Sequence, residues 1–196
     1  MQKAISGTLE GGAALKRHLK HIEQQLGQGA HVVVGFLDSA TYPAKHVEAA
    51  RERFLSGKSK RIDISGKGQH DFETNYGSGV AGLKVAQVAF WNEFGTIRAP
   101  ARPFFRTMIE SKSPRWGNAL GIALRKTDYN ARNALAIMGE GIRGQLRQSI
   151  RDWSTPPNSP KTVAIKGFNK PLIDSAVMIR SADYQVIDGD VGGEGD

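Results

Sequence analysis

The sequence contains no cysteine among its 196 residues. This absence excludes disulfide bonds, zinc sites built from thiolates and a cysteine nucleophile. Long apolar runs are missing too, since no stretch approaches the roughly 20 apolar residues that a membrane-spanning helix needs. The opening residues, MQKAISGTLEGG, also lack the apolar core of a signal peptide. We therefore expect a soluble intracellular product with no membrane partner.

Motifs for catalysis and for metal binding are scarce. His18 and His21 lie three residues apart in a predicted helix, but the acidic residues of a zinc site do not accompany them. Ser56–Lys60 contains the G-K-S of a phosphate-binding loop, yet Glu52 stands where its first glycine is required. Three acids lie in a segment with no core to position them for metal-dependent cleavage: Asp63, Asp71 and Glu73. We predict no catalytic, cofactor or metal site, and no enzymatic activity.

Positive charge dominates, but it is distributed unevenly. The formal net charge is +8, and the residues after Arg180 include five acids and no base. Since this acidic end contributes −5, the rest of the chain carries +13. A basic body with an acidic end suits neighbouring protein subunits of opposite charge, or nearby DNA, although ordinary solubility charge has the same appearance.

The N-terminal half is predicted to contain two helices, a strand and a long polar stretch. Apolar residues spaced 4-3-4 predict a helix over Leu9–Leu26, and the β-branched run His31–Leu37 predicts a strand. Because that strand is apolar on both faces, we expect it at the centre of a sheet. A short helix is predicted near Ala44–Phe54. Ser56–Gly79 is rich in Gly, Ser and Lys, so we expect a mobile loop or projecting hairpin, with a strand piece near Arg61–Ile64.

The C-terminal half is predicted to be built on one long helix between Trp116 and Trp153. Six apolar residues recur there at 3-4-4-4-3 and form one stripe: Leu135, Met138, Ile142, Leu146, Ile150 and Trp153. Three glycines weaken this helix by roughly 1 kcal/mol each, and they indicate a bend or the close approach of another backbone: Gly139, Gly141 and Gly144. Prolines begin a second mobile segment at 154–170. A short helix or turn at Pro171–Ile179 and a strand at Asp183–Ile187 follow.

Together these elements predict an α+β fold: a small mixed or antiparallel sheet of three to five strands, packed by one long helix and shorter helices, with long projecting loops. At this length we expect a single domain over 1–188, followed by an acidic flexible tail over 189–196.

The most informative stretch is Asn92–Ile109, NEFGTIRAPARPFFRTMI. Gly95 is placed to end a helix, since glycine adopts positive φ without strain. Pro100 keeps the chain extended, and Pro103 fits the first position of a new helix. We find no nucleophile, general base or metal site in this stretch, so it has the character of a rigid docking surface.

Two stretches resemble a known family. The first is N-E-F-G-T followed by P-x-R-P-F-F-R, within residues 92–106. The second, within 153–186, is W-x-x-x-P-N-S-P-x-T, then P-L-I-D-S-A, then S-A-x-Y-x-V. In this order they resemble the tail-completion and neck (head–tail connector) proteins of tailed bacteriophages. Ala176 stands where that family has a glycine, although alanine resists positive φ.

The resemblance implies a structural virion protein that completes the tail end or joins tail to head. It would act by assembling with itself into a ring, a hexamer because phage tails are generally six-fold. The implied partners are the neighbouring connector and tail-tube or tail-terminator proteins, with non-specific contact to passing DNA. The implied location is the neck or tail of the virion, with assembly in the host cytoplasm. A non-specific DNA-binding protein of a phage or prophage is the alternative function.

Two sets of residues are candidates for contact with partners. The candidate interface combines aromatic anchors, arginines and acids, any of which could instead serve the core or solubility: Trp91, Glu93, Phe94, Arg98, Arg102, Phe104, Phe105, Arg106, Asp183, Asp188 and Asp190. The candidate DNA-facing set recurs every four residues on the long helix: Arg143, Arg147 and Arg151. That stripe is either an ordinary solvated face or the lining of a channel, where phosphate contacts weaken with salt.

Overall fold

The computed structural model describes residues 12–27, 29–36, 39–42, 82–97, 99–174 and 176–189. The expected helix at 44–54, the polar stretch at 56–79 with its strand piece, and the tail from 190 onward lie outside the described residues. Two candidate interface residues, Arg98 and Asp190, lie outside them as well.

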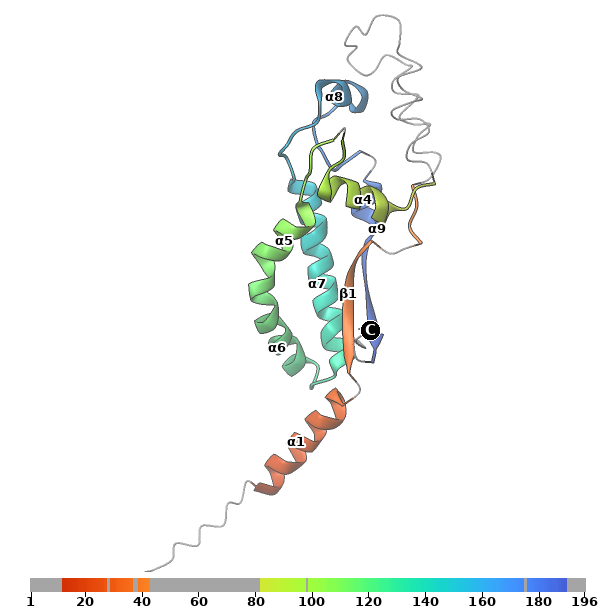
Figure 1. Ribbon diagram of the computed structural model, residues 1–196. Helices are drawn as coiled ribbons and strands as arrows, with labels where there is room; N and C mark the ends of the chain where they lie inside the picture. The colour runs from red at the N-terminus through yellow and green to blue at the C-terminus, as the bar shows by residue number, and fades with distance from the viewer. Residues whose placement is uncertain are drawn as a thin grey trace, which may run out of the picture.

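The fold combines several helices with one two-stranded sheet, which packs against the long helix α7 (Figure 1). In chain order the elements are α1 (Gly12–Leu26), β1 (Ala30–Phe36), α4 (Val85–Phe94), α5 (Phe104–Lys112), the 3₁₀ turn η2 (Ser113–Arg115), α6 (Trp116–Lys126), α7 (Ala131–Asp152), α8 (Pro160–Lys166), α9 (Val177–Ser181) and β2 (Ala182–Asp188). The long helix α7 runs through the body, with α5 and α6 on one side and the two strands on the other. Helices α4, α8 and α9 gather at one end, and α1 projects from the opposite end.

The sheet confirms the α+β class, but the number of strands predicted was wrong. In the part of the chain that the structure describes, β1 pairs antiparallel with β2 alone. One face, carrying Val32 and Tyr184, packs on α7, because a Cβ added at Gly139 of that helix would touch both side chains. The other face is open, and Val33 is 47% exposed. The apolar run 31–37 is therefore not a central strand; it is one half of a two-stranded sheet covered on one side.

The single helix predicted between Trp116 and Trp153 is two helices. Asp128 and Tyr129 adopt positive φ, 51° and 63°, which a right-handed helix cannot accommodate. Asn130 then starts α7, since its side chain accepts a hydrogen bond from the backbone N–H of Asn133 at 2.9 Å. The two helices are antiparallel neighbours, and the indole N–H of Trp116 donates to Gln145 across them.

The core lies where α7 meets α4, α5 and α9. Its largest fully buried side chains are Phe104, Leu146, Ile150 and Val85. The predicted apolar stripe of α7 therefore faces the core. Of its three glycines, only Gly139 is packed closely, and its neighbours are side chains of the strands rather than backbone, whereas Gly141 and Gly144 face open space.

The segment predicted as a loop at 154–170 contains a helix. Ser159 caps α8 by accepting from the backbone N–H of Thr162 at 3.2 Å, and Pro160 occupies its first turn. Gly167 ends it with a φ of 79°. These are standard helix boundary signals, and the proline-rich composition of the segment obscured them.

Candidate interface

The junction between α4 and α5 is fixed by one buried carboxylate. Glu93 is only 5% exposed, and its oxygens accept from the backbone N–H groups of Phe105 and Arg106 at 2.9 and 3.1 Å. The Arg106 side chain donates to the same carboxylate at 2.9 Å. Glu93 therefore caps the first turn of α5 from another helix, where a negative charge also suits the helix dipole. Its place is structural, at the base of the candidate interface rather than on its surface.

The turn between these helices is also constrained. Gly95 has a φ of 80°, and its N–H bonds the carbonyl of Trp91 at 2.9 Å. A Cβ at this position would lie 2.8 Å from the backbone nitrogen of Ala101. Both its conformation and its crowding require glycine, as the sequence indicated. Pro103 is the N-cap of α5, one position before the predicted one.

An exposed apolar surface is built on this frame, and we call it the aromatic patch: Phe90, Trp91, Phe94 and Ile97. Phe90 and Phe94 lie one helical turn apart with ring centroids 4.6 Å from each other. The guanidinium of Arg106 lies over the ring of Phe94, 4.7 Å from its centroid. Sequence analysis did not single out Phe90 or Ile97, although the i, i+4 spacing of the two phenylalanines would have indicated a shared helix face.

The predicted aromatic cluster therefore divides between core and surface. Phe104 is 1% exposed and packs edge-on against Phe36, with centroids 6.4 Å apart. Phe105 is half-buried, while Phe94 is 53% exposed. The core reading is confirmed for Phe104, whereas for the exposed Phe94 contact with a neighbouring subunit stays a prediction.

Arg102 joins the two stretches that carried the family resemblance. Its side chain is buried and donates to the carbonyls of Pro156 and Pro157 at 3.2 and 3.3 Å. Its backbone N–H bonds the carbonyl of Asn92 at 2.7 Å. Arg102 therefore acts as an internal brace between segments 54 residues apart, and its predicted role at an interface stays a prediction.

Both stretches also line one pocket of about 460 Å³, at the end of the molecule where α4, α8 and α9 meet. Burial, opposed by the nearby charge of Asp174 and aided by that of Arg102, lowers the pKa of Lys166 to about 8. Its ammonium donates to the carbonyl of Lys170 at 2.6 Å. Burial raises the pKa of Tyr42, which also lines the pocket, to about 12, with a further contribution from Asp174.

The position where the resembling family has glycine has the backbone that glycine favours. Ala176 adopts a φ of 60° and a ψ of 15°, in the left-handed region, directly before α9. The turn is thus kept despite the substitution, at a cost in backbone strain.

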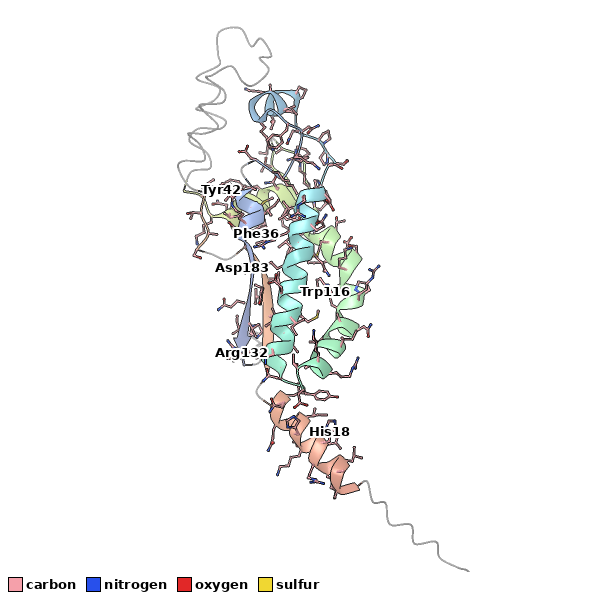
Figure 2. All side chains as sticks on the ribbon, turned by 180° about the vertical axis from the view of Figure 1, so that it is seen from behind. His18, Phe36, Tyr42, Trp116, Arg132 and Asp183 are labelled. Carbon is pink, nitrogen blue, oxygen red and sulfur yellow. The ribbon has the colours of Figure 1, made fainter. Side chains whose placement is uncertain are left out.

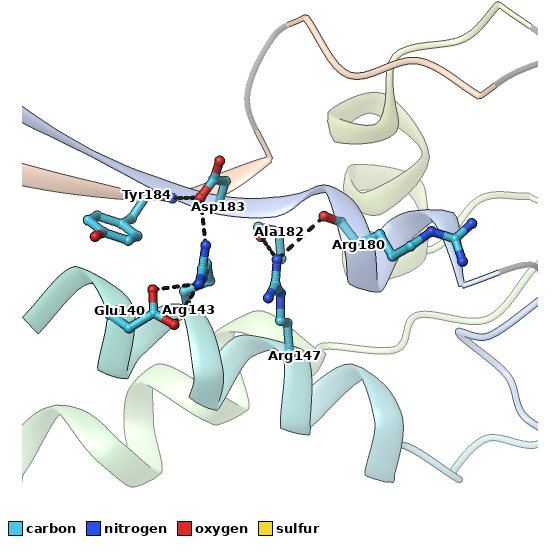
Figure 3. Close-up of polar contacts among 7 residues, drawn as sticks. All are labelled: Glu140, Arg143, Arg147, Arg180, Ala182, Asp183 and Tyr184. Atoms are coloured by element: carbon cyan, nitrogen blue, oxygen red, sulfur yellow. Dashed lines mark hydrogen bonds and ion pairs between the residues drawn. The ribbon is translucent and has the colours of Figure 1, made fainter. Parts of the chain in front are cut away.

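Two of the three candidate DNA-facing arginines, Arg143 and Arg147, bond to the neighbouring strand and helix (Figure 3). Arg143 pairs with Glu140 and, at 3.2 Å, with Asp183. Arg147 donates to the carbonyls of Ala182 and Arg180 at 2.8 and 3.4 Å. These two side chains hold β2 and α9 onto α7, whereas the exposed Arg151 bonds Gln148 at 2.7 Å.

Two predicted interface acids also find partners within the chain. Asp183 accepts from the backbone N–H of Tyr184 and from Arg143, and these contacts lower its pKa. Asp188 pairs with Arg132, which lies at the start of α7 (Figure 2). Both side chains of this pair are largely exposed, whereas in the pair of Asp183 with Arg143 the arginine side chain is only 23% exposed.

Within the described ranges, no group of three or more His, Cys, Asp or Glu side chains is arranged to hold a metal ion. No helix in those same ranges is long and apolar enough to cross a membrane. Comparisons with protein-family models, with curated proteins and with solved structures found no match.

Proposed function

We propose that this protein is a structural component of a tailed-phage virion that completes the tail end or joins tail to head by ring assembly. The observation that carries the proposal is the aromatic patch on its rigid frame. Isolated apolar side chains on a surface are ordinary. Here Phe90 and Phe94 lie ring to ring beside the Arg106 guanidinium, with Trp91 and Ile97 also exposed in the same stretch of chain, and this is the composition of an interface centre.

The frame matters because docking is stronger when the contact residues are held in place beforehand. Glu93, Gly95 and Arg102 fix the path of the chain beneath the patch through bonds to α5, α4 and the 156–157 loop. These three residues belong to the stretch that resembles the phage family. The pattern thus has a physical role, since it fixes the backbone beneath an exposed apolar surface.

The test is incorporation into particles. Phe90→Ser and Phe94→Ser remove the apolar rings from the patch, and Ile122→Ser is the matched control because Ile122 is equally exposed on α6, away from the patch. In a phage that carries the variant gene, we expect both patch variants to fold normally and to leave neck or tail unfinished, while the control assembles. Electron microscopy of the parent particle should show a ring of this chain at the neck or tail end. A particle with no such ring, or with a single asymmetric copy, contradicts the proposal.

A DNA-binding function receives less support from the same structure. Arg143 and Arg147 are held against β2 and α9, so neither offers a free cation to phosphate. Binding to duplex DNA that falls steeply with salt, and that is lost in Arg151→Gln, would favour this alternative.

A further inference from the structure

The pocket between α4, α8 and α9 has no part in the proposed function, yet it has the size and lining of a ligand site (Figure 1). Its volume is about 460 Å³, within the range of pockets that hold small molecules. Buried Leu172 and Met178 belong to its apolar wall, and a few polar side chains interrupt that wall. This mixture suits a ligand that combines a short apolar part with one polar or charged group.

Lys166 brings a buried cation to this pocket. The residue is 6% exposed, and its ammonium donates to the carbonyl of Lys170 at 2.6 Å. The ammonium also lies over the ring of Phe168, 5.2 Å from its centroid. An ammonium has three N–H donors, so two of them have no acceptor within the described part of the chain. A buried cation with unpaired donors favours an anionic ligand, because charge-assisted hydrogen bonds are the strong ones.

The charges around the pocket leave an excess of one positive charge. Among the described residues of the lining, the charged side chains are Lys166, Arg102 and Asp174. A carboxylate matches this excess. A phosphate group carries about 1.5–2 negative charges, so Asp174 would repel it more strongly than it repels a carboxylate.

Asn158 supplies a second polar group whose needs the fold does not meet. The residue is 9% exposed and lines the pocket, and its backbone N–H donates to the side-chain oxygen of Asn169 at 3.1 Å. The amide nitrogen of its side chain is buried and has no acceptor among the residues that the structure describes. A half-turn about the last side-chain bond exchanges this nitrogen with the amide oxygen at little steric cost. The amide can therefore present N–H donors to a ligand, and an acceptor there relieves the cost of a buried unpaired donor.

We infer that this pocket binds a carboxylate carried on a short apolar group, which pairs with the Lys166 ammonium and accepts from the Asn158 amide. The apolar part packs on the wall that contains Leu172 and Met178. The carboxylate belongs either to a free acid or to an acidic side chain of a peptide with apolar neighbours, and the experiment distinguishes these two sources. The inference goes beyond the proposed function and does not depend on it.

A titration of the full-length protein by nuclear magnetic resonance tests this site, with hexanoate as the probe and hexanamide as its uncharged counterpart. Hexanoate should shift the side-chain amide resonances of Asn158 and the Cε resonance of Lys166. It should also raise the pKa of Lys166 above its lowered value of about 8, because a bound anion stabilises the ammonium. Arg102 and Asp174 act on the same ammonium in the free protein, so the change on binding reports the ligand. Hexanamide should bind about tenfold more weakly, or less well still.

Two substitutions remove the groups that recognise the carboxylate. Lys166→Met removes the ammonium, and Asn158→Asp keeps the size of the side chain but replaces its N–H donors with a carboxylate oxygen. Each should weaken hexanoate binding by about tenfold or more. Lys126→Met is the matched control, because Lys126 is exposed on α6 and outside the pocket lining, so the same charge is lost elsewhere. It should bind hexanoate as the parent does. If a pocket variant fails to fold, the comparison of hexanoate with hexanamide on the parent protein still decides.

A peptide with one glutamate between two leucines, blocked at both ends, is the second probe, and its glutamine counterpart is the control. Binding of this peptide without hexanoate assigns the pocket to an acidic side chain of a protein partner, and binding of hexanoate alone assigns it to a free acid. Either result, or binding of both, supports the inference. It is overturned if neither probe shifts the resonances of the pocket up to about 50 mM, or if charged and uncharged probes bind equally. Equal binding of hexanoate to Lys166→Met and to the parent would also overturn it.

Discussion

Alanine at two positions of the same helix should have opposite effects on stability. At Gly139 an added Cβ would lie 2.3 Å from one ring carbon of Tyr184 and 2.9 Å from a methyl of Val32. At Gly141, half a turn further along α7, nothing lies within 4 Å. The pair separates the helix propensity of alanine, which both substitutions gain, from the packing of α7 on the sheet, which only one disturbs.

The gain in helix propensity and the cost of crowding are of comparable size, so their sum decides whether the substitution at Gly139 raises or lowers the free energy of unfolding. Replacing glycine by alanine inside a helix stabilises by roughly 1 kcal/mol. Forcing extra volume into a packed contact costs roughly 1–3 kcal/mol, and Tyr184 can yield only if the strand moves, because the crowded carbons are near its own backbone. We expect Gly141→Ala to stabilise by about 1 kcal/mol and Gly139→Ala to destabilise by about 1–2 kcal/mol. For a chain of this length, thermal midpoints should then differ by roughly 4–12 °C.

Thermal and urea unfolding of the two variants provide the measurement. A double-mutant cycle with Tyr184→Ala isolates the contact, because Gly139→Ala should lose most of its cost once the ring is removed. If Gly139→Ala proves as stable as Gly141→Ala, the packing of α7 on the two strands described above is wrong.

Three further substitutions test the core, the pocket and the strained turn. Phe104→Ala should lower the free energy of unfolding by on the order of 3–5 kcal/mol, because the ring is buried. Phe94→Ala, on the exposed aromatic patch, should change the thermal midpoint little. Equal losses of stability in the two variants would show that the two rings share one environment. The pKa of Lys166 is lowered to about 8 from 10.5 in the folded protein. Between pH 8 and 10.5 the unfolded chain therefore binds more protons than the folded one, and the free energy of unfolding should rise with pH. That rise should vanish in Lys166→Met, and a rise that persists in this variant refutes the lowered pKa of Lys166. Ala176→Gly should stabilise by roughly 1 kcal/mol, because the residue has a φ of 60°; a loss of stability, read from urea midpoints, would argue against the left-handed turn.

Local rules predicted most of the elements that the structure describes. The 3.6-residue period placed α1 within a few residues, and the β-branched run His31–Leu37 did the same for β1. The apolar stripe of α7 was found as well, although the start of its helix was predicted 15 residues too early, at Trp116 instead of Ala131. Gly95 was also predictable, since a helix ending in a sharp turn requires a residue that tolerates positive φ. The break between α6 and α7 was missed because the sequence there contains neither glycine nor proline, although Asn130 is a standard N-cap residue.

Long-range partners were beyond the sequence. Four charged residues were predicted at an interface because they lie near aromatic residues or in an acidic stretch: Glu93, Arg102, Asp183 and Asp188. Their partners lie between 12 and 56 residues away, within the same chain. Nothing in spacing alone distinguishes a charge that braces the fold from one that meets another subunit. The aromatic patch shows the same limit from the other side, because Phe90 became visible as part of it only when Phe94 and Arg106 were placed beside it.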